Sequence, residues 1–256
     1  MTEQLNRIID SLRDEMIDTL KKWIMTPSVK ADPQPNAPFG ADVRKMLDLA
    51  LEDCERLGFK TEEFDGYIAH ADLGEGDDYE ALAILAHLDV VPVGDGWVYP
   101  PFGATWLPEH DVLIGRGVDD NKSAFVAGLF AMRMLREFGV PMRHGVRLIC
   151  GTSEETGMQD MAALRKMGHR FPDTSLVPDA GFPVNYAQKG MIDGAITIPC
   201  QGHLLSLDAG SVRNVIPAKA VAVIAADINA VRAAVAQADP ADLQQLGDVS
   251  ILDPAG

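Results

Sequence analysis

The sequence has 256 residues, of which 47% are hydrophobic and 23% are charged, and its formal net charge is −16. This length is sufficient for one large domain, or for one domain and part of another. The acidic excess would repel phosphate backbones and anionic lipids, so we expect neither a nucleic acid nor a membrane as a partner. Three cysteines without C-x-x-C spacing argue against a disulfide framework and a zinc ribbon.

The first sixteen residues carry charges throughout and lack the apolar segment of a signal peptide. No later stretch has the ~18 consecutive apolar residues of a membrane span. We therefore expect a cytoplasmic protein.

Two amphipathic helices are predicted near the amino terminus. Apolar residues recur at helical spacing over residues 5–23 and again over about 43–57, where Gly58 ends the pattern. Four prolines in residues 27–40 predict a loop between these helices. A strand is predicted near residues 67–73.

The next apolar run, residues 81–86, leads directly into His87 and Asp89. This pattern predicts a buried strand that delivers polar groups at its carboxyl end, where ligands bind in an open α/β sheet. At a period of two residues, both side chains leave the strand on the same side. Asp89 could then accept from one ring nitrogen while the other faces a metal ion or a substrate. By itself, the pair also fits a histidine that is merely hydrogen-bonded at a strand end.

Residues 92–110 are rich in glycine, proline and aromatic residues, which fits either an ordered surface loop or a pocket wall. A short apolar run then leads through an acidic turn into a helix that Gly139 closes. Two further strands, at residues 146–150 and just before Asp179, also end in acidic residues. Strands that alternate with helices predict an α/β fold, with a mostly parallel sheet and helices on both faces.

The acidic residues and His87 are expected to converge on one edge of the sheet, because each follows a predicted strand. They are His87, Asp89, Asp119, Asp120, Glu154, Glu155 and Asp179. So much negative charge requires cations, and histidine with carboxylates suits zinc, manganese or cobalt. A carboxylate that bridges two ions would suit a two-metal site with ions ~3.5–4 Å apart.

Three competing sites fail simple checks. A calcium loop that begins at Asp119 would need Glu where Phe130 stands. The segment GRGVDDNKS is not a phosphate-binding loop, because Lys-Ser/Thr does not follow its second glycine. No G-x-S-x-G motif supports a nucleophilic serine.

The motifs HLDVVP, GRGVDDNKS, GTSEETG and VPDAGFP occur in this order. They resemble the zinc-dependent metallopeptidases that include aminoacylase, carnosinase, carboxypeptidase G and PepV-type bacterial dipeptidases. The resemblance covers about residues 3–220, and the dipeptidase branch is the most similar. It implies hydrolysis of dipeptides or N-acyl amino acids in a zinc-peptidase-like catalytic domain.

The resemblance also implies a ligand set. His87, Asp120 and Asp179 would hold a first ion, and Asp120 would bridge to a second ion that Glu155 also holds. The expected ions are zinc, or else manganese or cobalt.

The same resemblance implies the remaining roles. Asp89 would orient the His87 ring, and Glu154 would be the general base that deprotonates the attacking water and then protonates the leaving amine. Lys122 is expected to be structural and to pair with a nearby acidic residue. Ser123, in place of the usual glycine, is a small departure from the pattern.

The resemblance divides the chain into a catalytic segment, residues 1–187, and a partial α+β lid domain, residues 188–256. We expect lid strands within 189–210 and 214–226 and a helix over 228–237. The family returns after its lid to supply a last histidine ligand, and we expect no such segment within these 256 residues.

An alternative is therefore a catalytically inactive, truncated fragment or pseudoenzyme that retains one metal ion or binds peptides without cleavage. Among the other histidines, His203 lies in a predicted lid strand. Four are expected at the surface, namely His70, His110, His144 and His169.

Overall fold

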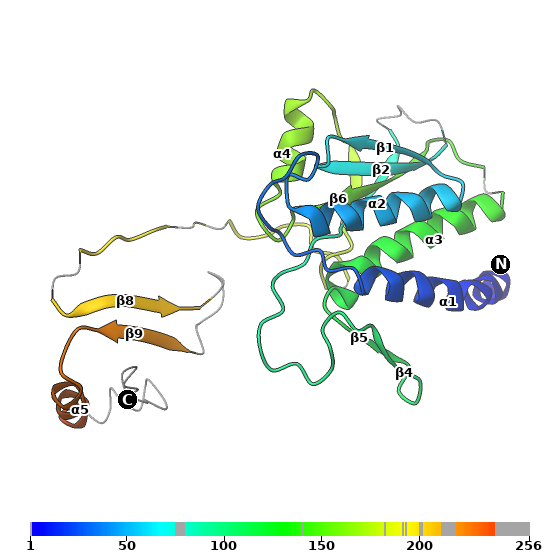
Figure 1. Ribbon diagram of the computed structural model, residues 1–256. Helices are drawn as coiled ribbons and strands as arrows, with labels where there is room; N and C mark the ends of the chain where they lie inside the picture. The colour runs from blue at the N-terminus through cyan, green and yellow to red at the C-terminus, as the bar shows by residue number, and fades with distance from the viewer. Residues whose placement is uncertain are drawn as a thin grey trace. The chain divides into compact units, whose positions relative to one another are not determined.

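The computed structural model describes residues 2–74, 80–139, 141–181, 183–190, 192, 194–199, 202–210 and 219–238. The chain divides into two compact units, Met1–Gln188 and Lys189–Gly256 (Figure 1). The first unit contains, in chain order, α1 (Thr2–Ile24), α2 (Ala41–Arg56), β1 (Lys60–Phe64), β2 (Ile68–Leu73), β3 (Leu82–His87), β4 (Thr105–Leu107), β5 (Val112–Ile114), the short helical turn η1 (Val118–Lys122), α3 (Ser123–Glu137), β6 (Val146–Gly151), α4 (Gln159–Lys166) and β7 (Thr174–Leu176).

The centre of this unit is a five-stranded sheet with the order β1-β2-β6-β3-β7. β3 pairs in parallel with β6 and β7, whereas β2 pairs antiparallel with β1 and β6. Four strands therefore run in one direction and β2 opposes them. The predicted α/β fold with a mainly parallel sheet is confirmed.

Two details of the strand prediction were wrong. β1 was not predicted, because Phe64 is its one apolar residue and a strand that is half exposed shows no apolar run. The apolar residues of β5 do not join the central sheet, since β5 pairs with β4 from the preceding loop. Asp119 and Asp120 therefore follow this separate hairpin and not a strand of the central sheet.

Alternation along the strands assigns side chains to two faces. Leu148 and Cys150 of β6 pack in the larger core together with apolar residues of α1, α2 and α3, and Ile149 packs in a smaller core with Leu164 of α4. Helices therefore cover both faces of the sheet, as predicted (Figure 1).

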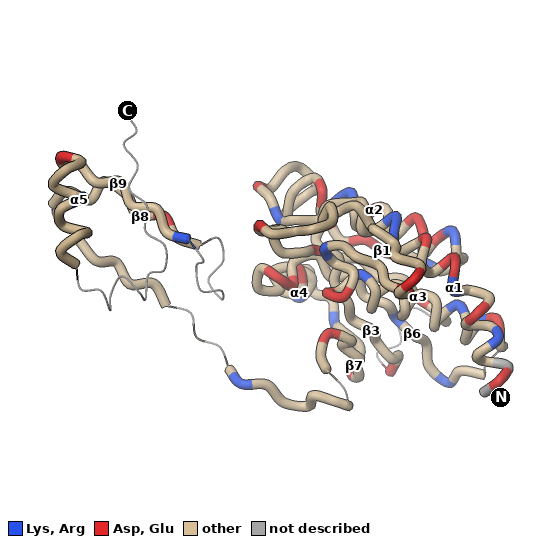
Figure 2. The backbone as a smooth tube through the Cα atoms, turned by 90° about the horizontal axis from the view of Figure 1, so that it is seen from below, with Lys and Arg blue, Asp and Glu red and all other residues tan. Residues whose placement is uncertain are grey.

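Charged residues of both signs line α1, as Figure 2 shows. Glu15 of α1 accepts hydrogen bonds from Arg56 of α2, over 3.0 Å, and from Arg133 of α3, over 2.6 Å. These hydrogen bonds lower the pKa of Glu15, although burial opposes the shift. One carboxylate thus connects three helices.

Among the described residues, none of the helices has both the length and the apolar character needed to cross a membrane.

The hydrogen-bond partner predicted for Lys122 and the surface position predicted for His70 were wrong. The Lys122 side chain is fully buried, and its Nζ donates to the carbonyl oxygens of Trp23, at 3.0 Å, and Thr26, at 2.9 Å. Its hydrogen-bond partners are thus the backbone at the end of α1 and not a carboxylate. His70 is 6% exposed and not at the surface, because β2 is covered on both sides.

The second unit contains β8 (Leu204–Ala209), β9 (Ala220–Ile224) and α5 (Ile228–Ala236). β8 and β9 are antiparallel, and the Asp227 side chain caps α5 by accepting from the backbone N–H groups of Asn229 and Ala230. The predicted helix is confirmed, and the described residues from 192 to 199 are not in strands. The start of the second predicted strand, residues 214–218, lies outside the described residues.

Candidate metal centre

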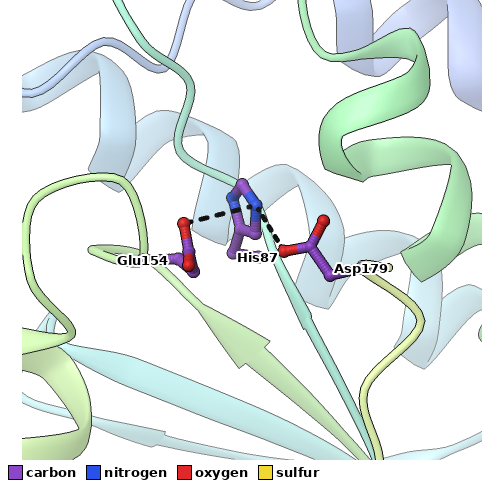
Figure 3. A group of neighbouring side chains, drawn as sticks. All are labelled: His87, Glu154 and Asp179. Carbon is purple, nitrogen blue, oxygen red and sulfur yellow. Dashed lines mark ion pairs between the residues drawn. The ribbon is translucent and has the colours of Figure 1, made fainter. Parts of the chain in front are cut away.

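His87 is the last residue of β3 and is 3% exposed. Its Nδ1–H donates to the backbone carbonyl oxygen of Asp89 over 2.9 Å, because a carbonyl can only accept. This bond directs Nε2 toward carboxylates of Asp120, Asp179 and Glu154, which lie 3.0, 3.5 and 3.9 Å away. In Figure 3 the His87 ring lies between Glu154 and Asp179.

Asp120 reaches this position because the backbone of η1 leaves helical geometry there, with φ −114° and ψ 98°. The next residue, Asn121, is buried and donates through Nδ2 to the carbonyl oxygen of Pro178 over 3.1 Å. Pro178 precedes Asp179, in the segment that leaves β7. This hydrogen bond therefore holds the segments of Asp120 and Asp179 side by side.

Glu154 and Glu155 lie in the loop between β6 and α4. Their backbone N–H groups donate to the two carboxylate oxygens of Asp89, over 3.1 and 3.2 Å. Asp89 Oδ1 also lies 3.4 Å from His87 Nδ1. The buried Asp89 side chain therefore contacts both the histidine and the loop that carries the two acidic residues.

The proximity of these carboxylates changes their protonation. Burial first, and then the charge of Asp120, raises the pKa of Glu155 to about 7. Burial also raises the pKa of Glu154. Burial by itself would lower the pKa of His87. The hydrogen bonds to Asp89 and the charges of Asp89 and Glu154 outweigh this effect of burial and raise the His87 pKa to about 9. The cluster therefore retains protons that a cation could replace.

The donor atoms form two overlapping groups, His87 with Glu154 and Asp179, and His87 with Asp120 and Glu155. Within each group they lie within 4.8 Å of one another. Imidazole with carboxylates fits a divalent transition metal, whereas calcium and magnesium prefer oxygen ligands alone. The residues present therefore fit a metal centre.

Asp119 belongs to neither group, and His87 is the one histidine in them among the described residues. His203, in the second unit, is exposed and contacts the carbonyl oxygen of Ala225 through Nδ1 over 2.9 Å.

A model of a known protein family, described as Peptidase family M20/M25/M40, matches residues 83–243, more than half of the chain. The chain belongs to this family. The residues that match the M20/M25/M40 model include all members of both donor groups. The resemblance found in the sequence is thus confirmed at the level of the family.

Individual relatives agree with this assignment. "Putative dipeptidase YtjP" of Bacillus subtilis is 33% identical over 221 residues, which are 83% of this chain and 47% of that protein. A crystal structure of human carnosine dipeptidase 1 is 26% identical, with a TM-score of 0.58 over 70% of this chain and 41% of that one. The structure of the di-peptidase Dug1p of Saccharomyces cerevisiae is 20% identical in sequence and superimposes with a TM-score of 0.52. The match covers 62% of this chain and 36% of the Dug1p chain, and it shows a shared fold. The chain spans less than half the length of each relative.

Sequence reasoning missed two buried residues beside this M20/M25/M40 centre, Asn121 and Asp160. Asp160 accepts hydrogen bonds from the N–H groups of Thr152 and Ser153, before the acid pair. Asp160 lies in the first turn of α4, where an acidic residue is favourable, and this was a usable signal. No local pattern indicated the contact that Asn121 makes with Pro178.

Proposed function

We propose that this chain forms the metal-binding part of a metallopeptidase that hydrolyses dipeptides or N-acyl amino acids. The observation that carries the proposal is the convergence of one imidazole and four carboxylates in two donor groups that share His87. Membership of the M20/M25/M40 family supports it, as do the names of the relatives, which describe dipeptidases. The proposed ions are zinc, or else manganese or cobalt.

We assign His87, Asp120 and Asp179 to a first ion, and Asp120 with Glu155 to a second. When bound, divalent ions polarise a scissile carbonyl and make water more acidic. The hydrogen bond from His87 Nδ1 to the backbone carbonyl oxygen of Asp89 keeps Nε2 directed at the ligand carboxylates. The amide bonds to Asp89 hold the loop of Glu155 against the same strand end.

Glu154 carries the proton in this proposal. Its carboxylate accepts a proton from the attacking water and donates it to the leaving amine. In the metal-free protein, burial and the neighbouring carboxylates raise its pKa. Bound cations would act in the opposite direction. Its carboxylate lies 3.9 Å from His87 Nε2, next to the proposed ligands Asp120 and Asp179, which is where such a base would have to act.

The test compares Glu154→Gln with Glu155→Gln. We expect Glu154→Gln to lower dipeptide turnover by about 10²–10⁴-fold while the metal content after dialysis stays at the wild-type value. Glu155→Gln should lose metal as well as activity, and Glu137→Gln, an exposed helix residue, should change neither.

Loss of metal from Glu154→Gln would instead make Glu154 a ligand, as its grouping with His87 and Asp179 would allow. A wild-type protein that binds metal and peptide but cleaves nothing would support the inactive, peptide-binding alternative.

A further inference from the structure

Four successive backbone N–H groups, those of residues 152–155, donate hydrogen bonds to two carboxylates. The first two donate to Asp160 Oδ2, over 2.6 and 3.2 Å. The last two donate to Asp89, over 3.1 and 3.2 Å. Since Asp89 follows β3 and Asp160 lies in α4, the loop is held between two different elements.

Asp160 is 0% exposed and lies in the first turn of α4, where its Oδ1 also accepts from the N–H of Met161 over 2.8 Å. Burying a carboxylate is unfavourable unless hydrogen bonds replace its water. Three backbone N–H groups do so here, and two of them belong to the loop. The carboxylate and the loop therefore stabilise each other.

The Asp160 carboxylate lies close to the ends of β3 and β6. A Cβ on Gly151, the last residue of β6, would lie 3.4 Å from Asp160 Oδ2 and 3.3 Å from His87 Cβ. Asp160 also lines a pocket together with His87, Glu154 and Asp179. Packing alone therefore leaves this side chain room to move, and the hydrogen bonds from the N–H groups of Thr152 and Ser153 couple its position to the loop.

We infer that Asp160 is a positioning residue for Glu154 and Glu155 and acts through the N–H groups of Thr152 and Ser153. The consequence for catalysis rests on the proposed function, in which Glu154 moves the proton and Glu155 holds an ion. Residues that orient a metal ligand through hydrogen bonds typically affect affinity or activity by about 10–100-fold.

The test is amide hydrogen exchange in metal-free Asp160→Asn, read at Glu154 and Glu155. An asparagine keeps the shape, but its NH₂ must face either the loop N–H groups or that of Met161. Both read-out N–H groups donate to Asp89 and not to Asp160. A merely local role would therefore accelerate exchange at residues 152 and 153 only. Positioning of the acid pair predicts faster exchange at Glu154 and Glu155 too, by about tenfold if local opening becomes easier by the free energy of one hydrogen bond.

The matched control is Asp53→Asn. Asp53 is a second buried carboxylate, 1% exposed, whose Oδ2 accepts from Trp23 Nε1 over 2.7 Å and lies 2.6 Å from Lys22 Nζ. It lies in α2 and belongs to neither donor group. Its substitution lowers stability by a similar mechanism, so we expect it to leave exchange at Glu154 and Glu155 and turnover unchanged.

In a wild-type protein that hydrolyses dipeptides, we expect Asp160→Asn to lower kcat by about 10–100-fold with KM changed by less than about threefold. Exchange that is faster at residues 152 and 153 but stays at the wild-type rate at Glu154 and Glu155 would overturn the inference, whatever the activity. If exchange at residues 152 and 153 also stays at the wild-type rate, the asparagine NH₂ faces Met161, and the decision passes to Asp160→Ser in the same measurement. A wild-type protein without hydrolysis would instead refute the proposed function, and the exchange data would still decide the role of Asp160. If Asp160→Asn does not fold, Asp160→Ser, which retains one small acceptor, replaces it in the same measurement.

Discussion

Substitution of Lys122 by methionine tests the role of a fully buried charged side chain. Lys122 is 0% exposed, and its Nζ donates to two carbonyl oxygens, those of Trp23 and Thr26, at the end of α1. Methionine preserves most of the apolar stem and removes the donor. The variant would therefore leave two buried carbonyls without this partner while its packing changes little.

The expected loss of stability follows from these two bonds. The Trp23 carbonyl would still accept from the N–H of Thr26 over 3.1 Å, so the main loss is at the Thr26 carbonyl. A buried acceptor left unpaired costs about 1–3 kcal/mol, and we expect the variant to lose about this much of the free energy of unfolding at pH 10, where the wild-type amine of the folded protein is neutral. Burial, opposed in part by the charge of Asp89, lowers the pKa of Lys122 from 10.5 to about 7.

The pKa of Lys122 makes this loss depend on pH. Between pH 7 and 10.5 the unfolded chain retains a proton that the folded protein has released, so the wild-type stability contributed by Lys122 rises with pH. The full shift corresponds to about 5 kcal/mol. Methionine does not titrate, and the deficit of Lys122→Met should therefore grow from neutral to alkaline pH.

Urea unfolding of the metal-free wild-type protein and variant, at several pH values between about 6 and 10, measures both effects. Lys45→Met, at an exposed position of α2, is the control and should stay within about 0.5 kcal/mol of the wild type. A deficit that is constant with pH would show that Lys122 keeps its proton in the folded state. A deficit below about 1 kcal/mol at pH 10 would show that the Thr26 carbonyl finds another partner.

Two further predictions concern metal and thiols. Zinc at 100 times its Kd should raise the free energy of unfolding of the metal-free protein by about 2.7 kcal/mol, measured in urea. His87→Ala should abolish this gain, and an equal gain in the variant would contradict the role of His87. Cys54 and Cys150 are buried, which raises the pKa of Cys54 to about 12 and that of Cys150 well above its ordinary value. After iodoacetamide treatment, peptide mass spectrometry should find both cysteines unmodified in the folded protein and alkylated in urea. Rapid labelling of either cysteine in the folded protein would refute this burial.

Local pattern was sufficient for the helices and for the strand that carries His87. The apolar periodicity of α1 and α2 and the apolar run of β3 depend on neighbours within a few residues, which a single sequence displays. The type of residue at each strand end also indicated a metal centre, because histidine and carboxylates have few other reasons to gather. The family motifs then distinguished Asp120 from Asp119.

Only the tertiary structure decided which partners the buried polar groups find. Lys122 was expected to meet a carboxylate, but packing brings it to two backbone carbonyls 96 and 99 residues earlier in the chain. His70 is buried because both faces of β2 are covered, with the Phe64 ring beside the imidazole, and Asn121 reaches Pro178 across 57 residues. Such contacts depend on how distant elements pack, and hydrogen-bonding capacity alone does not specify which distant group satisfies it.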